Sequence, residues 1–218
     1  MKFSERDYRK NLDGVQGLFT LGGMSECGKT TAGNRFHEIG VRKSKIIHIE
    51  YDMMRDRGMH TQNGLKPEDF ESLYEADQHA AFREFLFRLI EKMKEEGYGF
   101  ASLESLYRAP LGAFLKNELQ GRAANIYIES PLEVRARRET DKYNAKAAQN
   151  GENAVSYEEI LEKIRMKDAF KRRLKAEDVK TIADYVVDNS EKTSKEDFLV
   201  QIDAIAIDKG VVIPHKDF

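Results

Sequence analysis

Residues 23–30 carry a pattern whose residue types and spacing specify a chemistry. A glycine is followed by four variable positions, a second glycine, a lysine and a serine or threonine, which is the sequence motif of a phosphate-binding loop. In this chain the positions are Gly23, Met24, Ser25, Glu26, Cys27, Gly28, Lys29 and Thr30. Such a loop binds a nucleotide's phosphates with its backbone N–H groups and with the positive end of the helix that follows it. The pattern predicts a site for a nucleoside triphosphate.

The residues on either side of the loop support this interpretation over a chance match. Residues 18–21 form an apolar run typical of a buried strand, and residues 31–39 have the pattern of a helix that begins at Thr31. We expect Lys29 to face solvent and to reach the β- and γ-phosphates, and the Thr30 hydroxyl to bind Mg²⁺. The predicted cofactors are therefore ATP and Mg²⁺, held by residues 23–31.

Short apolar runs alternate with helical patterns along the chain, which predicts an α/β fold with a parallel sheet. The expected strands are residues 17–22, 45–50, 98–103, 124–129 and 183–188. A helix is predicted over 82–93 from its apolar spacing, another from Ser156 with Glu159 as a capping box, and a last one from Thr193 or Ser194.

Two segments depart from this alternation, residues 54–77 and residues 139–155. Both are polar and contain little that a core would bury. Each is either a solvated surface insertion or a mobile lid, because a lid must pack weakly enough to open. For residues 139–155 we favour the lid.

Charged residues follow two of the predicted strands, at the edge where open parallel sheets bind ligands. Asp52 and Arg55 follow the second strand, and Glu104 ends the third. Asp52 is expected beside the phosphate loop, and Glu104 is in the position of a carboxylate that holds Mg²⁺ directly or through water. Either acid could instead be a favourable charge at a helix N-terminus.

A helix after the fourth strand carries Arg135 and Arg138 on one face. A basic helix face is usually only solvated. Beside a triphosphate, however, arginines stabilise the charge that develops on the transferred phosphoryl group. We therefore expect Arg135 and Arg138, with Lys29, to act on that group.

Taken together, these segments resemble a known family. The loop at 23–30, the segment 52–55 (Asp-Met-Met-Arg) and the helix with Arg135 and Arg138 resemble the nucleoside-monophosphate kinase group of P-loop kinases. The segment 52–55 is similar to the Asp-Met-Leu-Arg of adenylate kinases, in which the arginine binds the acceptor's phosphate. Residues 156–198 look more like the end of dephospho-CoA kinases.

The resemblance covers most of residues 17–206 and implies a fold and an activity. The fold would be a P-loop kinase-like parallel five-stranded sheet with helices on both faces and a lid insertion. The activity would be transfer of the γ-phosphoryl group of ATP to a small-molecule acceptor such as a nucleotide, a nucleoside or a dephospho-CoA-like compound. If the acceptor is a hydroxyl, Asp52 is the candidate base. If it is a phosphate, Arg55 and Arg108 would bind its charge.

Other functions of a phosphate-binding loop fit less well. A GTPase would need a guanine-reading Asn-Lys-x-Asp segment, which the sequence lacks, and the chain is short for an ABC or AAA+ motor. A catalytically silent nucleotide-binding regulatory protein stays open as the alternative.

Composition narrows the class of protein further. A length of 218 residues suits one domain over 1–218, and a net charge of −2 gives no reason to expect a nucleic-acid partner. The single cysteine, Cys27, indicates a reducing compartment. No apolar run approaches the roughly 20 residues that span a bilayer. We expect a cytoplasmic protein with a small-molecule partner and no membrane.

Overall fold

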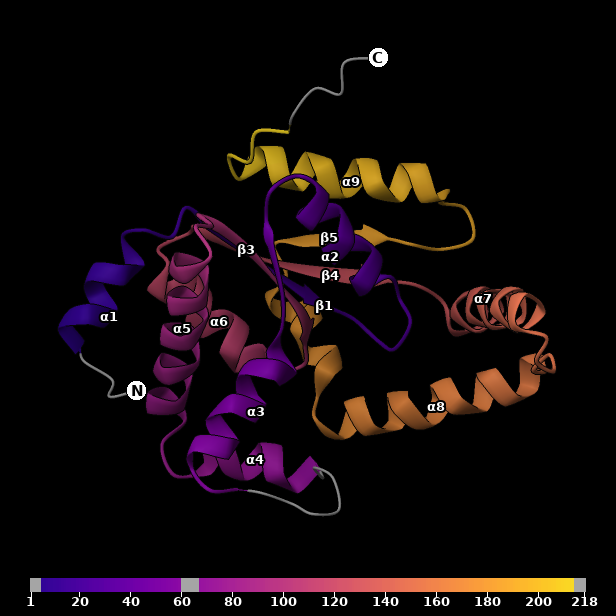
Figure 1. Cartoon of the computed structure of the whole chain (residues 1–218), viewed down its shortest axis with the longest axis horizontal. Coiled ribbons are helices and arrows are strands. Elements are labelled where there is room, and N and C mark those ends of the chain that lie inside the picture. The colour runs from indigo at the N-terminus through magenta and orange to yellow at the C-terminus, as the bar shows by residue number, and fades with distance from the viewer. Residues whose placement is uncertain (1–4, 60–66, 214–218) are drawn as a thin grey trace.

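Five strands form one parallel sheet in the order β2-β3-β1-β4-β5 (Figure 1). The computed structural model describes residues 5–59 and 67–213. The strands are β1 (Gly17–Gly22), β2 (Arg42–Lys45), β3 (Phe100–Leu106), β4 (Ala123–Glu129) and β5 (Tyr185–Asp188). Since β1 is the middle strand, the loop after it leaves the sheet at the centre of its carboxyl edge, where such sheets bind ligands. The predicted fold class is confirmed.

The second strand does not lie where its apolar run predicts it. The sequence predicts a strand over 45–50, but α3 (Ile46–Asp56) is a helix there and β2 is the polar segment before it. β2 pairs with β3 alone, so it is an edge strand whose side chains need not be apolar. The buried residues of α3 instead follow the i, i+3, i+4, i+7, i+8 spacing of one helix face: Ile46, Ile49, Glu50, Met53 and Met54.

Helices cover both faces of the sheet (Figure 1). One face is packed by α1 (Glu5–Leu12), α3, α4 (Pro67–Glu75), α5 (Gln78–Glu95) and α6 (Ala109–Glu118), and the other by α2 (Lys29–Glu38) and α9 (Lys195–Asp208). Side chains alternate across a strand, so neighbouring residues of β1 enter different cores. Leu18 packs in the first apolar cluster and Phe19 in the second.

The helices that the sequence predicts most clearly are confirmed. The apolar stripe of residues 82–93 lies buried in α5. Ser156 accepts a hydrogen bond from the Glu159 backbone N–H, while the Glu159 side chain accepts one from the Ser156 N–H, so the capping box is complete. α9 begins after an N-cap at Ser194 and buries Phe198 and Ile202. Within the described residues, no helix is both long and apolar enough to cross a membrane.

A long helical hairpin stands at one end of the molecule (Figure 1). It consists of α7 (Leu132–Asn150) and α8 (Tyr157–Arg173), which pack against each other and are followed by the 3₁₀ helix η1 (Ala176–Ile182). Residues 139–155, expected to break the alternation of elements, are therefore the larger part of α7 and the turn that follows it. Their low apolar content is explained by the size of the hairpin core, whose buried residues are Ala136, Ile160 and Ile164.

The other polar segment, residues 54–77, also contains helix. It includes the end of α3 and all of α4, while residues 60–66 lie outside the described part of the chain. On α4, Leu73 and Tyr74 are buried in the core shared with α3 and α5. The described portion of this segment is thus packed against the main body of the protein.

Candidate active site

The phosphate loop joins β1 to α2 and has a backbone that only glycine accommodates at two positions. Gly23 has φ of 125° and Gly28 has φ of 113°, both in the region that L-residues rarely adopt. A Cβ at Gly23 would lie 2.5 Å from the Ile128 carbonyl oxygen, and one at Gly28 would lie 2.5 Å from Asn189 Nδ2. The loop is therefore held tightly against β4 and against the segment after β5.

Lys29 points into the loop, where its ammonium group is surrounded by oxygen and sulfur. Its Nζ donates hydrogen bonds to the carbonyl oxygens of Gly23, at 3.0 Å, and Met24, and lies 3.3 Å from Cys27 Sγ. The expectation that Lys29 faces bulk solvent is wrong, because the residue is only 7% exposed. The ammonium group lies in the concavity where the phosphates of a nucleotide would bind.

Thr30 and Glu104 meet beside the loop, as the sequence predicts. The Thr30 hydroxyl donates to Glu104 Oε2 at 3.1 Å, and Lys43 of β2 lies 3.0 Å from Glu104 Oε1. A Cβ at Gly33 would lie 2.3 Å from Glu104 Oε1, so the glycine permits α2 to pass close to the carboxylate. A hydroxyl and a carboxylate are the oxygen ligands that Mg²⁺ prefers, and this pair fits the metal expected there.

A cavity of about 1010 Å³ opens in front of the loop. Residues 25–31 form one wall, α7 and α8 form another, and Asn189, Lys195 and Phe198 close the side towards α9. Among the residues that the structure describes, seven cationic side chains line it: Lys29, Arg135, Arg138, Lys142, Lys167, Lys171 and Lys195. Of the described acidic residues, Glu26 on the loop and Glu139 on α7 line the cavity. The excess of positive charge suits a polyphosphate.

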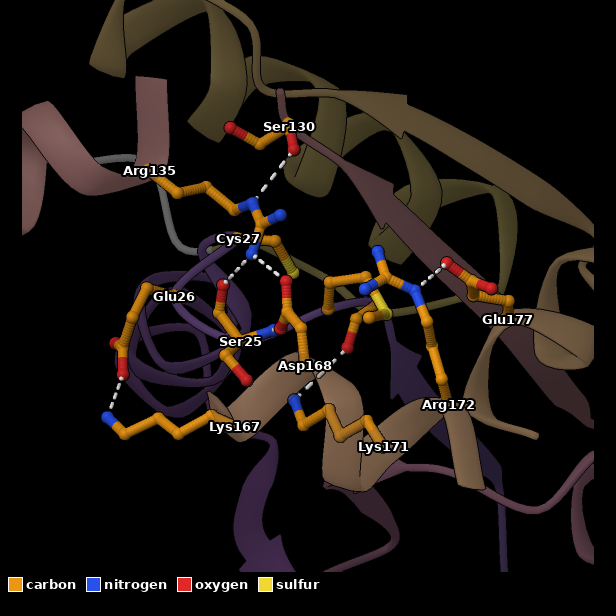
Figure 2. Close-up of polar contacts among 12 residues, drawn as sticks. Ser25, Glu26, Cys27, Ser130, Arg135, Lys167, Asp168, Lys171, Arg172 and Glu177 are labelled. Atoms are coloured by element: carbon orange, nitrogen blue, oxygen red, sulfur yellow. Dashed lines mark hydrogen bonds and ion pairs between the residues drawn. The ribbon is translucent and has the colours of Figure 1, made fainter. Parts of the chain in front are cut away.

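Arg135 lies at this cavity but is held by protein groups (Figure 2). Its Nη1 forms a buried ion pair with Asp168 Oδ2 of α8 at 2.8 Å and donates to the Ser25 carbonyl at 2.7 Å. Asp168 Oδ1 accepts from the Ser25 N–H at 2.9 Å. Burial works to raise the pKa of Asp168, but the Ser25 and Arg135 hydrogen bonds outweigh it and the pKa is lowered. Arg135 thus positions the phosphate loop against the hairpin.

Arg138 is likewise engaged, with the segment after β5. Its Nη1 donates to the carbonyl oxygen of Asn189 at 2.9 Å and to Asn189 Oδ1 at 2.8 Å, and its Nη2 donates to the Ser190 carbonyl. Asn189 Nδ2 in turn donates to the Cys27 carbonyl at 2.8 Å. This chain of contacts links α7, the segment after β5 and the loop, and Asn189 is a member that the sequence patterns do not reveal.

The structure does not bring Asp52 and Arg55 to the loop. Both lie on α3, because the segment is helix and not a strand end. Asp52 forms ion pairs with Lys92 of α5 at 2.7 Å and with Arg55 at 2.9 Å, and neither residue lines the cavity. Burial works to raise the pKa of Asp52, but Lys92 and Arg55 lower it overall. A carboxylate so paired is a weaker base than the sequence interpretation requires.

A buried carboxylate that the sequence interpretation missed lies on the same helix. Glu50 has no exposed surface, and its Oε1 accepts hydrogen bonds from Tyr74 at 2.7 Å and Tyr107 at 2.5 Å. Burial raises the pKa of Glu50. Arg108 lies over the rings of both tyrosines, at 4.7 and 5.1 Å from their centres, and donates to the Phe70 carbonyl. Because the sequence predicts that residues 45–50 form a strand, it does not indicate that Glu50 is buried on a helix.

The end of β3 connects this cluster with the cavity. Ser105 directly follows Glu104, lines the cavity and has φ of 69°, which is uncommon for a residue with a side chain. The pairing of β1 with β3 shifts register at the same point, between Leu21 and Gly22. Tyr107 and Arg108 follow two and three residues later. Strain of this kind is often found where a chain is shaped to meet a ligand.

A second lysine approaches the loop from α8 (Figure 2). Lys171 Nζ lies 3.4 Å from the Gly23 carbonyl oxygen, which also accepts from Lys29. Burial, and next the neighbouring Lys29, lower the pKa of Lys171 to about 7. No motif identifies Lys171 in the sequence, because its place depends on how α8 packs against the loop.

Comparison with known proteins shows the fold. No protein-family model matches the sequence, and no curated protein does. An uncharacterized protein from Eubacterium ventriosum is 12% identical and matches over 89% of this chain and 98% of its own, with a TM-score of 0.54. TT1252 from Thermus thermophilus is 16% identical over 89% and 98%, with a TM-score of 0.50. A dephospho-CoA kinase from Campylobacter jejuni is 16% identical and matches over 88% of this chain and 97% of its own, with a TM-score of 0.42.

The chain has an α/β fold in which a phosphate-binding loop follows the central strand of a parallel sheet. The parallel five-stranded sheet with helices on both faces is the fold class that the sequence predicts, and the structure adds the strand order β2-β3-β1-β4-β5, with the phosphate loop after the central strand. The similar solved structures are at most 16% identical, so the likeness concerns the fold alone.

Proposed function

We propose that this protein is an ATP-dependent kinase that transfers the γ-phosphoryl group to a small-molecule acceptor. One observation carries the proposal: the glycine-rich loop holds Lys29 in its concavity and Thr30 against Glu104, in front of a cavity lined by cations. Such a loop can bind the phosphates and the metal of a nucleotide at the same time.

Different groups of the chain have different roles in the proposed phosphoryl transfer. The loop N–H groups and Lys29 bind and orient the phosphates, and the cations of α7 and α8 neutralise charge on the transferred group. Thr30 and Glu104 would hold Mg²⁺, which when bound would shield the negative charge of the phosphates. Arg135 and Arg138 act through the loop and Asn189, which they position.

The acceptor is proposed to enter where β3 ends, near Ser105. Ser105 lines the cavity, and Tyr107 and Arg108, which contact Glu50 and Tyr74 respectively, follow two and three residues later in the chain. Asp52 has no part in this proposal, because it is paired with Arg55 and Lys92 and does not line the cavity. The acceptor candidates remain nucleotides, nucleosides and dephospho-CoA-like compounds.

The experiment is an assay of ADP formation with a panel of such acceptors. We expect one class of acceptor to stimulate ADP formation in the wild-type protein. Lys29→Ala is expected to lower the stimulated rate by at least about 10²-fold, because a charged donor to the phosphates is removed. The matched control is Lys163→Ala, an exposed lysine of α8, which should retain the wild-type rate. ATP binding without turnover on any acceptor would instead favour a silent nucleotide-binding protein.

A further inference from the structure

Lys171 shares a carbonyl oxygen with the lysine of the phosphate loop. The Gly23 oxygen lies 3.0 Å from Lys29 Nζ and 3.4 Å from Lys171 Nζ, so two amino groups converge on one acceptor. Both residues line the cavity in front of the loop. Two ammonium ions in such a position repel each other, and Lys171, the less closely held of the two, is the one whose charged form is disfavoured.

The acids near Lys171 are committed to other partners. Asp168, one turn earlier on α8, binds Arg135 of α7 and the Ser25 N–H. Of the acids on the cavity wall, Glu26 binds Lys167 and Glu139 binds Lys142. On the side towards η1, Arg172 binds Glu177. From the loop itself, Cys27 is the other titratable group that faces Lys171, and it favours the ammonium form, as Asp168 does.

We propose that Lys171 is a second phosphate-binding cation of the loop and that it takes up a proton when a triphosphate enters the cavity. The inference rests on the nucleotide site of the proposed function and adds a coupling between that site and pH. A polyphosphate beside Lys171 adds negative charge to that of Asp168 and Cys27, and so favours the ammonium form further.

The direction of the effect follows from the pKa of Lys171 without nucleotide, which burial and Lys29 lower to about 7. Below that pH, Lys171 is already protonated, so nucleotide binding is accompanied by little proton uptake. Above it, binding takes up most of one proton per site, so affinity falls as the pH rises from 7 to 9. Phosphate groups contribute little in this range, because their second pKa is about 6.

The test is calorimetric titration of the full-length protein at pH 8 with Mg²⁺ and a non-hydrolysable ATP analogue. Two buffers of different ionisation enthalpy give the number of protons taken up. We expect uptake in the wild-type protein and none in Lys171→Arg, whose guanidinium is charged throughout. Lys171→Met should bind the analogue on the order of 10- to 100-fold more weakly at pH 6.5, where a charge-assisted hydrogen bond is lost.

Lys163→Met serves as the matched control, since Lys163 is an exposed lysine on the same helix. It should show wild-type affinity and uptake, and the melting temperature of each variant checks that it is folded. Equal proton uptake in the wild-type protein and Lys171→Arg would overturn the inference while leaving the nucleotide site intact. Failure of the wild-type protein to bind the analogue would overturn the proposed nucleotide site and this inference with it.

Discussion

At the residue scale, Glu104 joins the metal side of the site to the sheet. The carboxylate is buried in β3, accepts from Thr30 and pairs with Lys43. Its place was predictable, because an acid at the end of an apolar strand needs a partner at the ligand edge. The contact with Gly33 on α2 was not predictable, since it depends on how the helix crosses the strand.

Glu104→Gln should raise the Mg²⁺ concentration needed for half-maximal activity by about 10- to 100-fold, as loss of a group around a metal typically does. The substitution preserves the shape of the side chain and removes its charge. Glu96→Gln is the matched control. Glu96 pairs at the surface with Arg42 of β2, the strand that also carries Lys43, the partner of Glu104. Activity measured across a Mg²⁺ titration distinguishes the two. An unchanged Mg²⁺ requirement in Glu104→Gln would remove this residue from the metal site.

Glu50 should make the protein less stable as the pH rises. Burial raises its pKa in the folded protein above that in the unfolded chain, which is about 4.3. The folded state therefore binds more protons in the window between the two values, and stability is lost as the pH rises through it. Glu50→Gln keeps the hydrogen bonds to Tyr74 and Tyr107 and cannot ionise.

Urea unfolding at pH 4.5 and pH 8 measures this effect. We expect the unfolding free energy to fall less between these pH values in Glu50→Gln than in the wild-type protein. Glu71→Gln, at an exposed position of α4, should follow the wild-type protein. If the unfolding free energy of Glu50→Gln changes with pH as much as that of the wild-type protein, the pKa of Glu50 is not raised in the folded state.

At the scale of elements, the sequence predicts a helix or strand correctly where its buried residues recur at a regular spacing. The stripe of α5, the capping box of α8 and the strand β1 are each found at their predicted positions. The prediction of a strand over 45–50 is wrong for a physical reason. Over so short a stretch, apolar residues fit a strand and one face of a helix equally well. The true edge strand β2 has four residues, Arg-Lys-Ser-Lys, and carries no apolar signal at all.

The hairpin of α7 and α8 is expected to depend on one buried ion pair. Asp168→Asn leaves the Arg135 charge uncompensated between the hairpin and the phosphate loop, which should cost about 3 kcal/mol of unfolding free energy. Because the pKa of Asp168 is lowered, its contribution is present above the unfolded pKa of about 3.9 and is lost as the pH falls below it.

Urea unfolding at pH 7 measures the loss. Glu162→Gln is the control, because Glu162 and Arg165 form an exposed pair on α8 at 3.7 Å and the change should stay within about 0.5 kcal/mol. If Asp168→Asn is as stable as Glu162→Gln, the pair does not anchor the hairpin.

Residues 139–155 are proposed to close over bound nucleotide as the tip of this hairpin. The hairpin core is small, and Glu139 and Lys142, at the start of this segment in the middle of α7, line the cavity. Addition of a non-hydrolysable ATP analogue with Mg²⁺ should slow amide hydrogen exchange in this segment, since new charged contacts favour the closed state. Exchange in α5, on the far side of the sheet, is the internal reference. Equal exchange in 139–155 with and without the analogue would make it a surface element.

At the scale of the whole molecule, the strand order brings together groups that are far apart in the sequence. The central position of β1 places the loop between Glu104 of the neighbouring β3 and the segment after β5, which contributes Asn189. The sequence predicts the loop and Glu104 through local patterns. It does not predict Asn189, Lys171 or Glu50, because each acquires its role only through packing between elements.

The most direct test of the proposed kinase activity follows the γ-phosphoryl group itself. The wild-type protein is incubated with γ-labelled ATP, Mg²⁺ and the acceptor that stimulates ADP formation, and the products are separated. We predict that the label appears on the acceptor in equal amount to the ADP formed, and that Lys29→Ala yields neither. Label recovered only as inorganic phosphate, or left entirely in ATP, would contradict the proposal that this protein is a kinase.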